Sequence, residues 1–383
     1  MSETRVGIVG TGFAAGAHIE ALRRVNGPRV AAISASSQEK AAVEAARLGV
    51  DASFGDYNRM LDSGAVDAVH NCTPNHLHLE VNRAVLERGL HLLSEKPLAV
   101  DSAETEQLVE ASQRDRIVSG VCFNYRHFPL VRESRDQLLS GRFGRAHFVH
   151  GSYLQDWLLK PEDWNWRLDS SRAGRSRAVA DIGSHWLDNV EYVTGDRVTE
   201  VFAQLFRLHE QRLRPRAEAE TFRSGSGETQ PFSVDTEDGA VVSLRFSSGM
   251  KGALTVSQVS PGRKNRLSWQ VDAGSASLAW NQEEPNRLWI GRRDEANAEL
   301  VRDPSLLGDA GASLAHLPGG HQEGWADGLK NLMIDFYSAV DAARRGDMYE
   351  ASFATFSDAH HITQVVEAIV ESDRSERWVK VDE

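Results

Sequence analysis

Cysteine is scarce in this 383-residue chain, which contains only Cys72 and Cys122, each within a short apolar run. No CxxC pair or disulfide framework is present, which excludes a disulfide-stapled protein and predicts a reducing compartment. Long apolar runs are also missing, because no stretch approaches the roughly 20 apolar residues that span a bilayer. Residues 1–10 lack the basic-then-apolar pattern of a signal peptide. We therefore expect a soluble, cytoplasmic protein with no membrane partner.

An excess of basic residues is absent as well. Lysine and arginine total 43 against 55 aspartates and glutamates, which gives a formal net charge of −12. This balance argues against nucleic acid or an anionic membrane as the general partner. The composition is 41% hydrophobic, 26% charged and 8% aromatic, which is typical of a globular protein and excludes a disordered or collagen-like chain. The length predicts two domains.

Residues 1–123 alternate short apolar runs with helical patterns, which is typical of βαβ units in a parallel sheet. Right-handed crossovers then give a doubly wound parallel sheet of the Rossmann type, so the fold class is α/β. The strands are expected at 6–10, 30–34, 66–72, 91–94 and 117–123, and the helices at 18–25, 38–48, 76–88 and 102–114.

Residues 124–383 predict a second, α+β domain with an open, mainly antiparallel sheet. Hairpin-sized loops at Ser248-Gly249 and around Gly262 indicate antiparallel pairing of the strands that they join. A long helix is expected to begin at Trp325 and to end at Gly346. The polar segment 208–231 predicts a mobile surface excursion. The strands are expected at 146–153, 198–207, 240–247, 253–259, 267–273, 275–280 and 287–290.

The string Gly10-Thr-Gly12-Phe13-Ala-Ala15 lies between the first expected strand and its helix. A dinucleotide pyrophosphate needs a tight turn and a close backbone approach, which glycine allows. The following helix offers free N–H groups and a positive dipole end. A glycine-rich string alone is weak support, since turns collect glycine, but its position between strand and helix favours nucleotide binding.

The residue that reads the adenosine ribose is expected at the end of the second strand, where NAD-preferring sites usually carry Asp or Glu. This chain has Ala35-Ser36-Ser37 there, with no acid. The two hydroxyls suit either a 2′-OH or a 2′-phosphate, and Lys40 suits a phosphate. The choice between NAD and NADP therefore stays open.

Two further turns lie at the carboxyl edge of the predicted sheet, where ligands bind in such folds. Thr73-Pro74-Asn75, followed by His78, predicts a strand-to-helix turn that also contacts the cofactor. His76 and His78 diverge on a helix, so no metal site is expected. Glu95-Lys96-Pro97 ends the next strand. Lys96 is either a solvated surface residue or, beside a nicotinamide, a cation that holds an alcohol oxygen.

The second domain contains Asp181-Ile-Gly-Ser-His185. Ser184 predicts a helix cap and Gly195 the end of that helix, so Asp181 and His185 are expected to emerge together at its start. A histidine can accept an alcohol proton while a carboxylate orients it or the substrate. In isolation a capping Asp and a packed His are the commoner interpretation, but the combination with Lys96 favours catalysis.

A cluster of three arginines, Arg172, Arg175 and Arg177, precedes this motif without an intervening acid. Arginine suits bidentate recognition of carboxylate, phosphate or sulfonate groups, and a solvated arginine-rich loop fits the pattern equally well. An anionic sugar is therefore one hypothesis for the substrate. Trp157, Trp164 and Trp166 suit stacking on a sugar face, although core packing is at least as common.

The ordered set of motifs resembles the glucose-fructose oxidoreductase / inositol dehydrogenase / MocA-like (Gfo/Idh/MocA) family. The set runs from the glycine-rich turn and its histidine, Gly10 to His18, through Thr73 to His78 and Glu95–Pro97 to Asp181–His185. Members have an N-terminal Rossmann domain and a C-terminal domain whose open sheet often forms the oligomer contact. They commonly use NAD or NADP to oxidise or reduce a sugar or cyclitol. Ala15 and Ala35 depart from the family pattern, which affects the cofactor preference.

The resemblance implies a catalytic set of Lys96, Asp181 and His185. His185 would take a proton from a ring hydroxyl, Lys96 would stabilise the forming alkoxide, and Asp181 would position the substrate while hydride passes to the nicotinamide. Cofactor contacts are expected for Gly10, Gly12, Phe13, Ala15, Ala35, Ser36, Ser37, Thr73, Pro74, Asn75, His78, Glu95, Lys96, Asn124, Trp166 and Arg167. Substrate contacts are expected for Lys96, Tyr125, Trp166, Arg172, Arg175, Arg177, Asp181, His185 and His321.

The leading hypothesis is thus an NAD(P)-dependent dehydrogenase acting on a secondary hydroxyl of a sugar, sugar derivative or cyclitol, assembled as a dimer or tetramer through its C-terminal sheet. The alternative is an NAD-dependent glycoside hydrolase, which oxidises C3 transiently, eliminates the aglycone, adds water and returns the hydride. A non-catalytic nucleotide sensor is disfavoured by the joint presence of Lys96, Asp181 and His185. The first two hypotheses both require Lys96 and His185, from separate domains, to act beside one nicotinamide ring.

Overall fold

The computed structural model describes residues 3–114, 116–216 and 228–382 of the chain, which divides into two compact units. Unit 1 consists of Met1–Asn124 and Ala326–His360, and unit 2 of Tyr125–Trp325 and His361–Glu383. Residues 326–360, which the sequence placed in the second domain, therefore belong to the first unit. A search of the described helices found none with the length and hydropathy of a membrane-spanning segment.

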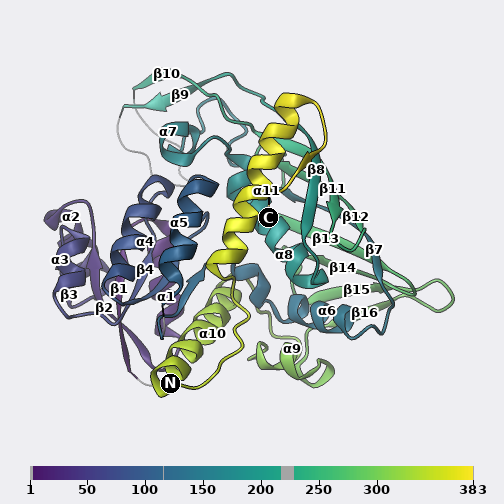
Figure 1. Cartoon of the computed structure of the whole chain (residues 1–383), viewed down its shortest axis with the longest axis horizontal. Helices are drawn as coiled ribbons and strands as arrows, with labels where there is room; N and C mark the ends of the chain where they lie inside the picture. The colour runs from purple at the N-terminus through teal and green to yellow at the C-terminus, as the bar shows by residue number, and fades with distance from the viewer. Residues whose placement is uncertain (1–2, 115, 217–227, 383) are drawn as a thin grey trace. The chain divides into compact units, whose positions relative to one another are not determined.

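Unit 1 is built on a six-stranded sheet with the order β3-β2-β1-β4-β5-β6, in which every pairing is parallel (Figure 1). The strand order reverses between β1 and β4, the place where open parallel sheets bind ligands at the carboxyl ends of their strands. The strands are β1 (Thr4–Val9), β2 (Pro28–Ser34), β3 (Ala52–Phe54), β4 (Ala68–Asn71), β5 (His91–Ser94) and β6 (Ser119–Val121).

Helices connect these strands, and their caps explain where several of them begin and end. The Ser37 hydroxyl accepts a hydrogen bond from the Lys40 N–H at the start of α2, and Gly49 ends that helix with φ +62°. β3 and α3 were not predicted, because elements this short carry little periodic signal. The helices are α1 (Phe13–Arg23), α2 (Gln38–Leu48), α3 (Tyr57–Asp62), η1 (Asn75–Leu77), α4 (His78–Glu87) and α5 (Ser102–Ser112).

The long helix α10 (Trp325–Arg345) belongs largely to unit 1. It ends at Gly346, which has a φ of +75°, as the sequence predicted. The Tyr337 ring stacks on His70 of β4, with ring centroids 5.9 Å apart. Past the helix, Ala354 forms a β-bridge with Val121 of β6. The buried apolar face of α10 explains why this C-terminal segment joins the first unit.

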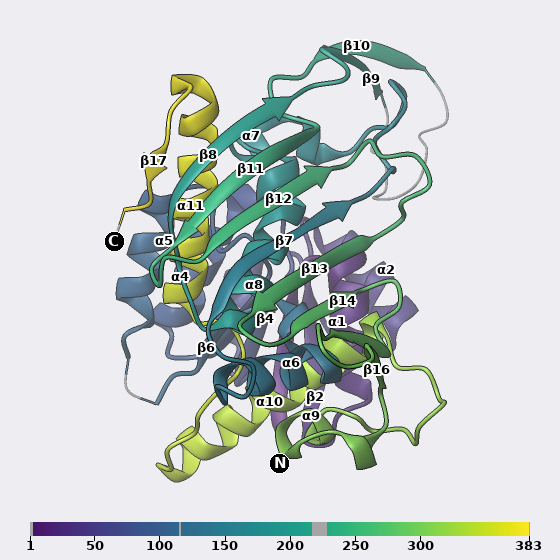
Figure 2. The same ribbon diagram turned by 90° about the vertical axis from the view of Figure 1, so that its right-hand side faces the viewer.

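Unit 2 is built on a nine-stranded sheet with the order β16-β15-β14-β13-β7-β12-β11-β8-β17 (Figure 2). Only the β7–β12 pairing is parallel among these described strands. The strands are β7 (Ala146–Leu154), β8 (Val198–Phe206), β11 (Gly239–Phe246), β12 (Lys251–Ser257), β13 (Arg266–Ala273), β14 (Ser277–Asn281), β15 (Arg287–Gly291), β16 (Ala298–Val301) and β17 (Val379–Lys380).

The hairpin expected around Gly262 is wrong. β7 lies between β12 and β13 and pairs with both of them, so the loop at Gly262 crosses over a strand from earlier in the chain. A turn-like loop shows that two strands are close in sequence, but it does not show which strand fills the space between them. The hairpin at Ser248-Gly249 is confirmed, because β11 and β12 pair antiparallel.

The two ends of the predicted mobile excursion, 208–231, instead form an antiparallel ladder of β9 (Gln211–Pro215) and β10 (Thr229–Ser233). Arg212 of β9 is fully buried and bonds Asp238, which anchors this ladder to the unit. Residues 217–227 of that segment lie outside the described residues.

Helix α8 (Ser184–Thr194) lies against the large sheet and positions the second set of predicted site residues. The Trp186 indole N–H donates to the Ser268 carbonyl of β13, and the Trp269 indole N–H donates to Asn189. Trp186, Leu187, Val190 and Val193 are buried, so the core of unit 2 lies between this helix and the sheet. The other helices are η2 (Asn124–His127), α6 (Pro129–Leu139), η3 (Trp166–Leu168), α7 (Ser170–Ala173), the π-turn η4 (Val179–Gly183), η5 (Pro304–Leu306), α9 (Asp309–Ser313) and α11 (Phe356–Ser375).

Candidate functional site

The glycine-rich turn follows β1 at the point where the strand order of unit 1 reverses. Gly10 has a φ of +111°, and a Cβ there would lie 2.5 Å from the Cys72 carbonyl oxygen after β4. Gly12 is the N-cap of α1, and within the described part of the chain no side chain caps that helix by a hydrogen bond. Phe13 is 58% exposed, whereas Ala15 is buried. The turn therefore places a helix N-terminus without a side-chain cap at the switch point, which suits a pyrophosphate.

We expect replacement of Gly10 by alanine to weaken the binding of NAD(H), because the new Cβ meets the Cys72 carbonyl and the positive φ is strained. A non-glycine residue in such a conformation costs about 1–3 kcal/mol. Binding is measured by fluorescence titration with NADH. Gly16→Ala is the matched control, since a Cβ at Gly16 meets no described atom within 4 Å apart from its chain neighbours and the backbone of its own helix. Equal NADH affinity of the two variants would contradict the prediction.

The segment after β2 is the predicted ribose-reading turn. The Ala35 N–H donates to the Phe54 carbonyl at 3.1 Å, which ties the turn to β3. The Gly10 N–H donates to the Ser34 carbonyl at 2.9 Å, which holds the ribose turn beside the glycine-rich turn. Ser37 uses its hydroxyl as the cap of α2, and Ser36 precedes it.

The Thr73 turn follows β4 at the same edge of the sheet. The Thr73 hydroxyl donates to the Asn71 side-chain oxygen at 2.7 Å. His78 is buried and places its Nε2 2.8 Å from the Thr73 carbonyl and its Nδ1 2.6 Å from the Pro97 carbonyl. His78 thus fastens the Thr73 turn to the Glu95-Lys96-Pro97 turn. Pro74 and Asn75 lie between them in sequence, at the start of η1.

The Glu95-Lys96-Pro97 turn follows β5, and the Glu95 N–H donates to the Asn71 carbonyl at 2.9 Å. The Lys96 N–H in turn donates to Glu95 Oε2 at 3.1 Å. Glu95 Oε1 lies 3.0 Å from Nε2 of the buried His18. Burial by itself raises the pKa of Glu95, but the hydrogen bond and charge of His18 outweigh burial and lower that pKa to about 2.

This shift predicts a stability difference in acid. The pKa of Glu95 is about 2 in the folded protein and lies near the ordinary 4.5 in the unfolded chain, so protonation favours unfolding. The stabilisation by the ionised carboxylate is present above pH 4.5 and is lost as the pH falls toward 2. We expect the free energy of unfolding of Glu95→Gln to fall less steeply than that of the parent over this range. Urea unfolding at a series of pH values measures it, and parallel curves would contradict it.

One buried amide supports cofactor binding by unit 1. Asn124 follows β6 and is 4% exposed, and its Nδ2 has no hydrogen-bond partner among the described residues. An unpaired buried donor is costly unless a ligand or water completes it. Together with the N-terminus of α1, which the described side chains do not cap, this donor means that the residues of unit 1 fit a dinucleotide.

In unit 2, His185 is held against two tyrosine rings. The ring centroids of His185 and Tyr125 are 4.9 Å apart in an edge-to-face contact, and those of His185 and Tyr153 are 6.3 Å apart. The Tyr153 hydroxyl donates to Asn265 Oδ1 at 2.7 Å and accepts from the Tyr125 hydroxyl at 2.8 Å. Burial raises the pKa of both tyrosines, so they stay neutral. The imidazole is therefore fixed by rigid aromatic neighbours.

Asp181 lies in the π-turn before α8, one turn ahead of His185. Its Oδ1 accepts from Arg167 Nε at 3.1 Å and its Oδ2 from Gln258 Nε2 at 2.9 Å. The predicted cap at Ser184 is wrong, because Ser184 lies inside continuous helical backbone and donates to the Ala180 carbonyl. The π-turn still brings Asp181 and His185 to the same helix start, and such turns recur at functional sites.

The expectation of three arginines open to a ligand is not met at Arg177. Its side chain is fully buried, where it pairs with Asp238 and donates to Gln258 Oε1 at 2.8 Å. Because arginine only donates, it orients the Gln258 amide so that the NH₂ group faces Asp181. Arg175 is exposed, and the Arg172 guanidinium lies 5.9 Å from the centre of the Trp166 ring.

The remaining residues expected to contact cofactor or substrate lie in the short helix η3 and in loops of unit 2. The Arg167 guanidinium lies over the Trp166 ring, 4.5 Å from its centre, and its Nε donates to Asp181. The two side chains therefore lie together beside Asp181. Trp157 and Trp164 pack against a core of Leu158, Leu168 and Val234, which is the packing interpretation of those tryptophans. His321 is exposed, and its carbonyl accepts from the buried Arg302.

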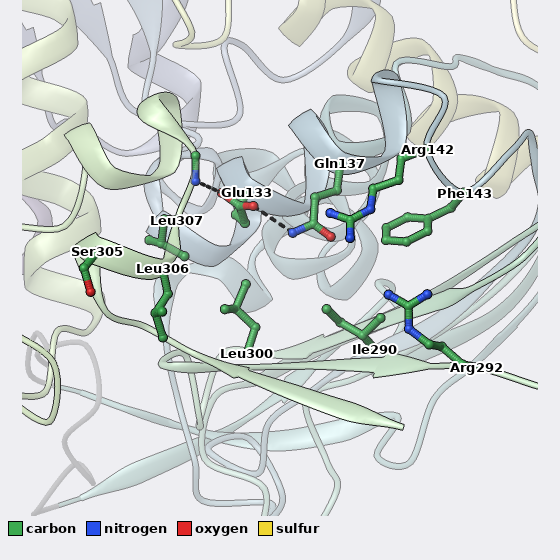
Figure 3. A pocket seen from close by; sticks show the side chains of 11 residues that line it. Glu133, Gln137, Arg142, Phe143, Ile290, Arg292, Leu300, Ser305, Leu306 and Leu307 are labelled. Carbon is green, nitrogen blue, oxygen red and sulfur yellow. Dashed lines mark hydrogen bonds between the residues drawn. The ribbon is translucent and has the colours of Figure 1, made fainter. Parts of the chain in front are cut away.

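A hollow of about 480 Å³ in unit 2 lies elsewhere, between α6 and the strands β15 and β16 (Figure 3). Arg142 and Arg292 both point toward the ring of Phe143 there. Glu133 accepts from Gln137 Nε2 at 2.7 Å and from the Gly308 N–H at 2.9 Å. None of the predicted site residues is among those that line it.

Sequence reasoning missed the residues that contact and support the predicted site residues Asp181, His185 and Arg177. Gln258, Tyr153 and Asn265 support Asp181 and His185, and Asp238 holds Arg177. Gln258 lies within the expected strand 253–259, where the sequence Val-Ser-Gln-Val at 256–259 did not mark it, and the structure shows that it is buried. Its partners lie up to 81 residues away in the chain, so no local pattern identifies them.

Comparison with protein families places both parts of the chain. Residues 4–123 match a family described as "Oxidoreductase family, NAD-binding Rossmann fold", and residues 131–277 match "GFO/IDH/MocA C-terminal domain". Levoglucosan dehydrogenase from Pseudarthrobacter phenanthrenivorans is 30% identical over 400 residues, covering 100% of this chain and 99% of that protein. A 1,5-anhydro-D-fructose reductase from Ensifer adhaerens is 28% identical over 64% of this chain and 67% of its own length.

Solved structures give the same result. A levoglucosan dehydrogenase in complex with NADH is 28% identical, covers 100% of both chains and superposes with a TM-score of 0.88. An inositol dehydrogenase homologue from Azotobacter vinelandii, complexed with NAD+, is 25% identical with a TM-score of 0.87 and covers 99% of this chain and 97% of its own.

Proposed function

Because the chain belongs to the Gfo/Idh/MocA family of oxidoreductases with an NAD-binding Rossmann domain, we propose that it oxidises a secondary hydroxyl of a neutral sugar or cyclitol with NAD. One observation carries the proposal: backbone and His78 contacts hold the Gly10, Thr73 and Lys96 turns together at the carboxyl edge of one parallel sheet. That edge joins a dinucleotide-binding turn to a primary amine.

Each cofactor contact proposed for unit 1 uses a group described above. The N–H groups at the start of α1 bind the pyrophosphate, the 35–37 turn binds the ribose, and Asn124 Nδ2 donates to the bound dinucleotide. When bound, NAD supplies the carbon that accepts the hydride. The proposal of NAD over NADP rests on the solved relatives, whose descriptions name NADH and NAD+.

In the proposed reaction, His185 accepts the proton of the reacting hydroxyl at a ring nitrogen. Its contacts with Tyr125 and Tyr153 fix the ring, so the proton acceptor is pre-oriented. The Lys96 ammonium stabilises the negative charge that develops on the same oxygen. Asp181 accepts a hydrogen bond from a neighbouring hydroxyl of the substrate, because Arg167 and Gln258 already hold both of its oxygens in place.

The burial of Arg177 favours a neutral substrate over the anionic one. Of the three arginines in the cluster, Arg177 is committed to Asp238 and Gln258. Arg167, whose guanidinium shares the Trp166 ring with Arg172, is already paired with Asp181. A carboxylate or phosphate on the substrate would also lie near the Asp181 carboxylate. Hydroxyl groups, which both donate and accept, suit this mixture of Asp181, Arg167 and Trp166.

The function is tested with a panel of neutral and anionic sugars, anhydrosugars, cyclitols and aryl glycosides, each offered with NAD+ and with NADP+. Reduced cofactor and released aglycone are measured separately. Stoichiometric NADH from a neutral sugar supports the dehydrogenase. Repeated aglycone release without net NADH would replace it with the redox-neutral glycosidase, and absence of both products across the panel would overturn the proposal.

We also propose that a second copy of the chain covers the outer face of the nine-stranded sheet. Apolar side chains on its strands are exposed, including Val241 of β11 at 54% and Trp289 of β15 at 38%. Light scattering after gel filtration measures the oligomeric state. A Val241→Glu variant is expected to dissociate, and a monomeric parent would overturn this part of the proposal.

A further inference from the structure

A hydrogen-bonded series of buried polar side chains in unit 1 leads to Glu95. Tyr337 of α10 places its hydroxyl 2.9 Å from His70 Nε2, and His70 Nδ1 lies 3.0 Å from His18 Nδ1. His18 Nε2 then meets Glu95 Oε1 at 3.0 Å. The first three residues are at most 1% exposed, so these contacts are shielded from water. The proposed reaction uses none of these three side chains directly.

The protons of this hydrogen-bonded series have one consistent arrangement. Glu95 Oε1 lies 3.0 Å from His18 Nε2 and favours the cationic form of that imidazole, and the hydrogen bond and charge of His18 lower the pKa of Glu95 in turn. Burial lowers the pKa of His70, and the positive charge of His18 lowers it further. A cationic His18 donates from both nitrogens, so His70 accepts at Nδ1 and donates from Nε2 to the Tyr337 hydroxyl. Every link then has one donor and one acceptor.

Through Glu95, the hydrogen-bonded series reaches the backbone of Lys96. Glu95 Oε1 is held by the His18 cation, while Glu95 Oε2 accepts from the Lys96 N–H at 3.1 Å. Burial raises the pKa of the nearby Cys122 thiol to about 12, so it stays neutral at 3.5 Å from His18 and does not compete with Glu95 for the cation. The carboxylate is therefore clamped between an imidazolium and the peptide that carries Lys96.

We propose that His18 is a positioning residue for the catalytic amine: it fixes the Glu95 carboxylate, the carboxylate fixes the Lys96 peptide, and His70 with Tyr337 fixes His18. The inference rests on the proposed function, because it assigns His18 an effect that passes through Lys96. A displacement of about 1 Å at a reacting group costs on the order of a hundredfold in rate. His18 should accordingly affect kcat more than the binding of sugar or cofactor.

The test is a double-mutant cycle of His18→Gln and Lys96→Met, using the sugar that the parent oxidises. Glutamine keeps one donor toward Glu95 and removes the charge. His18→Gln is expected to lower kcat about tenfold to a hundredfold while KM and NADH affinity change little. In the Lys96→Met background the same substitution should change kcat no further. An equal fold-loss in both backgrounds overturns the inference, whereas unchanged turnover in Lys96→Met alone overturns the proposed role of Lys96 and with it the inference.

Tyr337→Phe provides a second variant if His18→Gln does not fold. It removes the hydroxyl that bonds His70, at the end of the hydrogen-bonded series away from Lys96, and a smaller loss of kcat with unchanged KM is expected. The matched control is Tyr349→Phe, which removes a hydroxyl bonded to Asp335 at 2.7 Å and should keep the parent kcat. Equal kcat of Tyr337→Phe and Tyr349→Phe would overturn the inference.

The His18→Gln variant also tests whether a metal ion binds at His18, Glu95 and Cys122. One ligand atom each from His18, Glu95 and Cys122 lies within 4.8 Å of the others, which is close enough to hold a divalent metal ion. Elemental analysis of the purified protein is expected to find no stoichiometric metal. One equivalent of bound metal in the parent that is lost in His18→Gln would overturn the proposed positioning role of His18 and establish a metal centre.

Discussion

Lys96→Met is expected to lower kcat for sugar oxidation by about 10²–10³-fold, the range typical of losing one group that stabilises the charge developing on a reacting oxygen. The substitution removes the charge, keeps most of the aliphatic length and leaves the peptide N–H that bonds Glu95. Binding of NADH should survive, because the glycine-rich turn and the Thr73 turn are untouched. Steady-state kinetics together with a fluorescence titration of NADH separate the two quantities.

Lys380→Met is the matched control for this result. Lys380 is an exposed lysine in the short strand β17 of unit 2, and its loss should leave kcat unchanged. Lys96→Met protein that turns over the sugar as fast as the parent would show that this lysine is a solvated surface residue. The dehydrogenase would then need another cation at the forming alkoxide.

The second large effect is expected at Asp238, where Asp238→Asn should destabilise unit 2 by about 3–5 kcal/mol. Asp238 is fully buried and accepts from Arg177 and Arg212, and its Oδ2 accepts from the Leu208 N–H at 2.7 Å. Burial by itself raises the pKa of Asp238, but the charge of Arg177 and the hydrogen bonds lower it, so the carboxylate is ionised. The amide variant leaves two buried guanidinium groups without their counter-charge.

The midpoint of urea unfolding, followed by tryptophan fluorescence, measures this loss. Asp235→Asn is the control: Asp235 is exposed three residues away, and its change should stay within about 0.5 kcal/mol. Because Arg177 orients Gln258 and Gln258 holds Asp181, any Asp238→Asn protein that folds should also bind substrate less tightly. Equal unfolding midpoints of the two variants would refute the structural role of the ion pair.

The sequence predicted most strands of the unit 1 sheet, because parallel strands that are buried on both faces consist of short, local runs of apolar residues. The fold class, the glycine-rich turn and the edge positions of Thr73 and Lys96 all follow from that local pattern. The family resemblance is confirmed by the matches over 4–123 and 131–277. The catalytic roles of Lys96, Asp181 and His185 remain predictions.

Residues far apart in the chain required the structure. Tyr337 reaches His70 across 267 positions, and Arg177 reaches Gln258 across 81. Neither contact leaves a periodic or motif signal, because a hydrogen bond between distant side chains depends on how helices and strands pack. The same reason explains why β7 was not expected between β12 and β13.

The sequence by itself thus determined which short segments are strands, helices and tight turns, since propensity, capping and hydrophobic period act over a few residues. Only the tertiary structure decided that α10 belongs with the first sheet, that Arg177 is internal, and that His18 meets Glu95. Burial and charge pairing are properties of three-dimensional packing, and they determine which of the chain's many polar residues are free to meet a ligand.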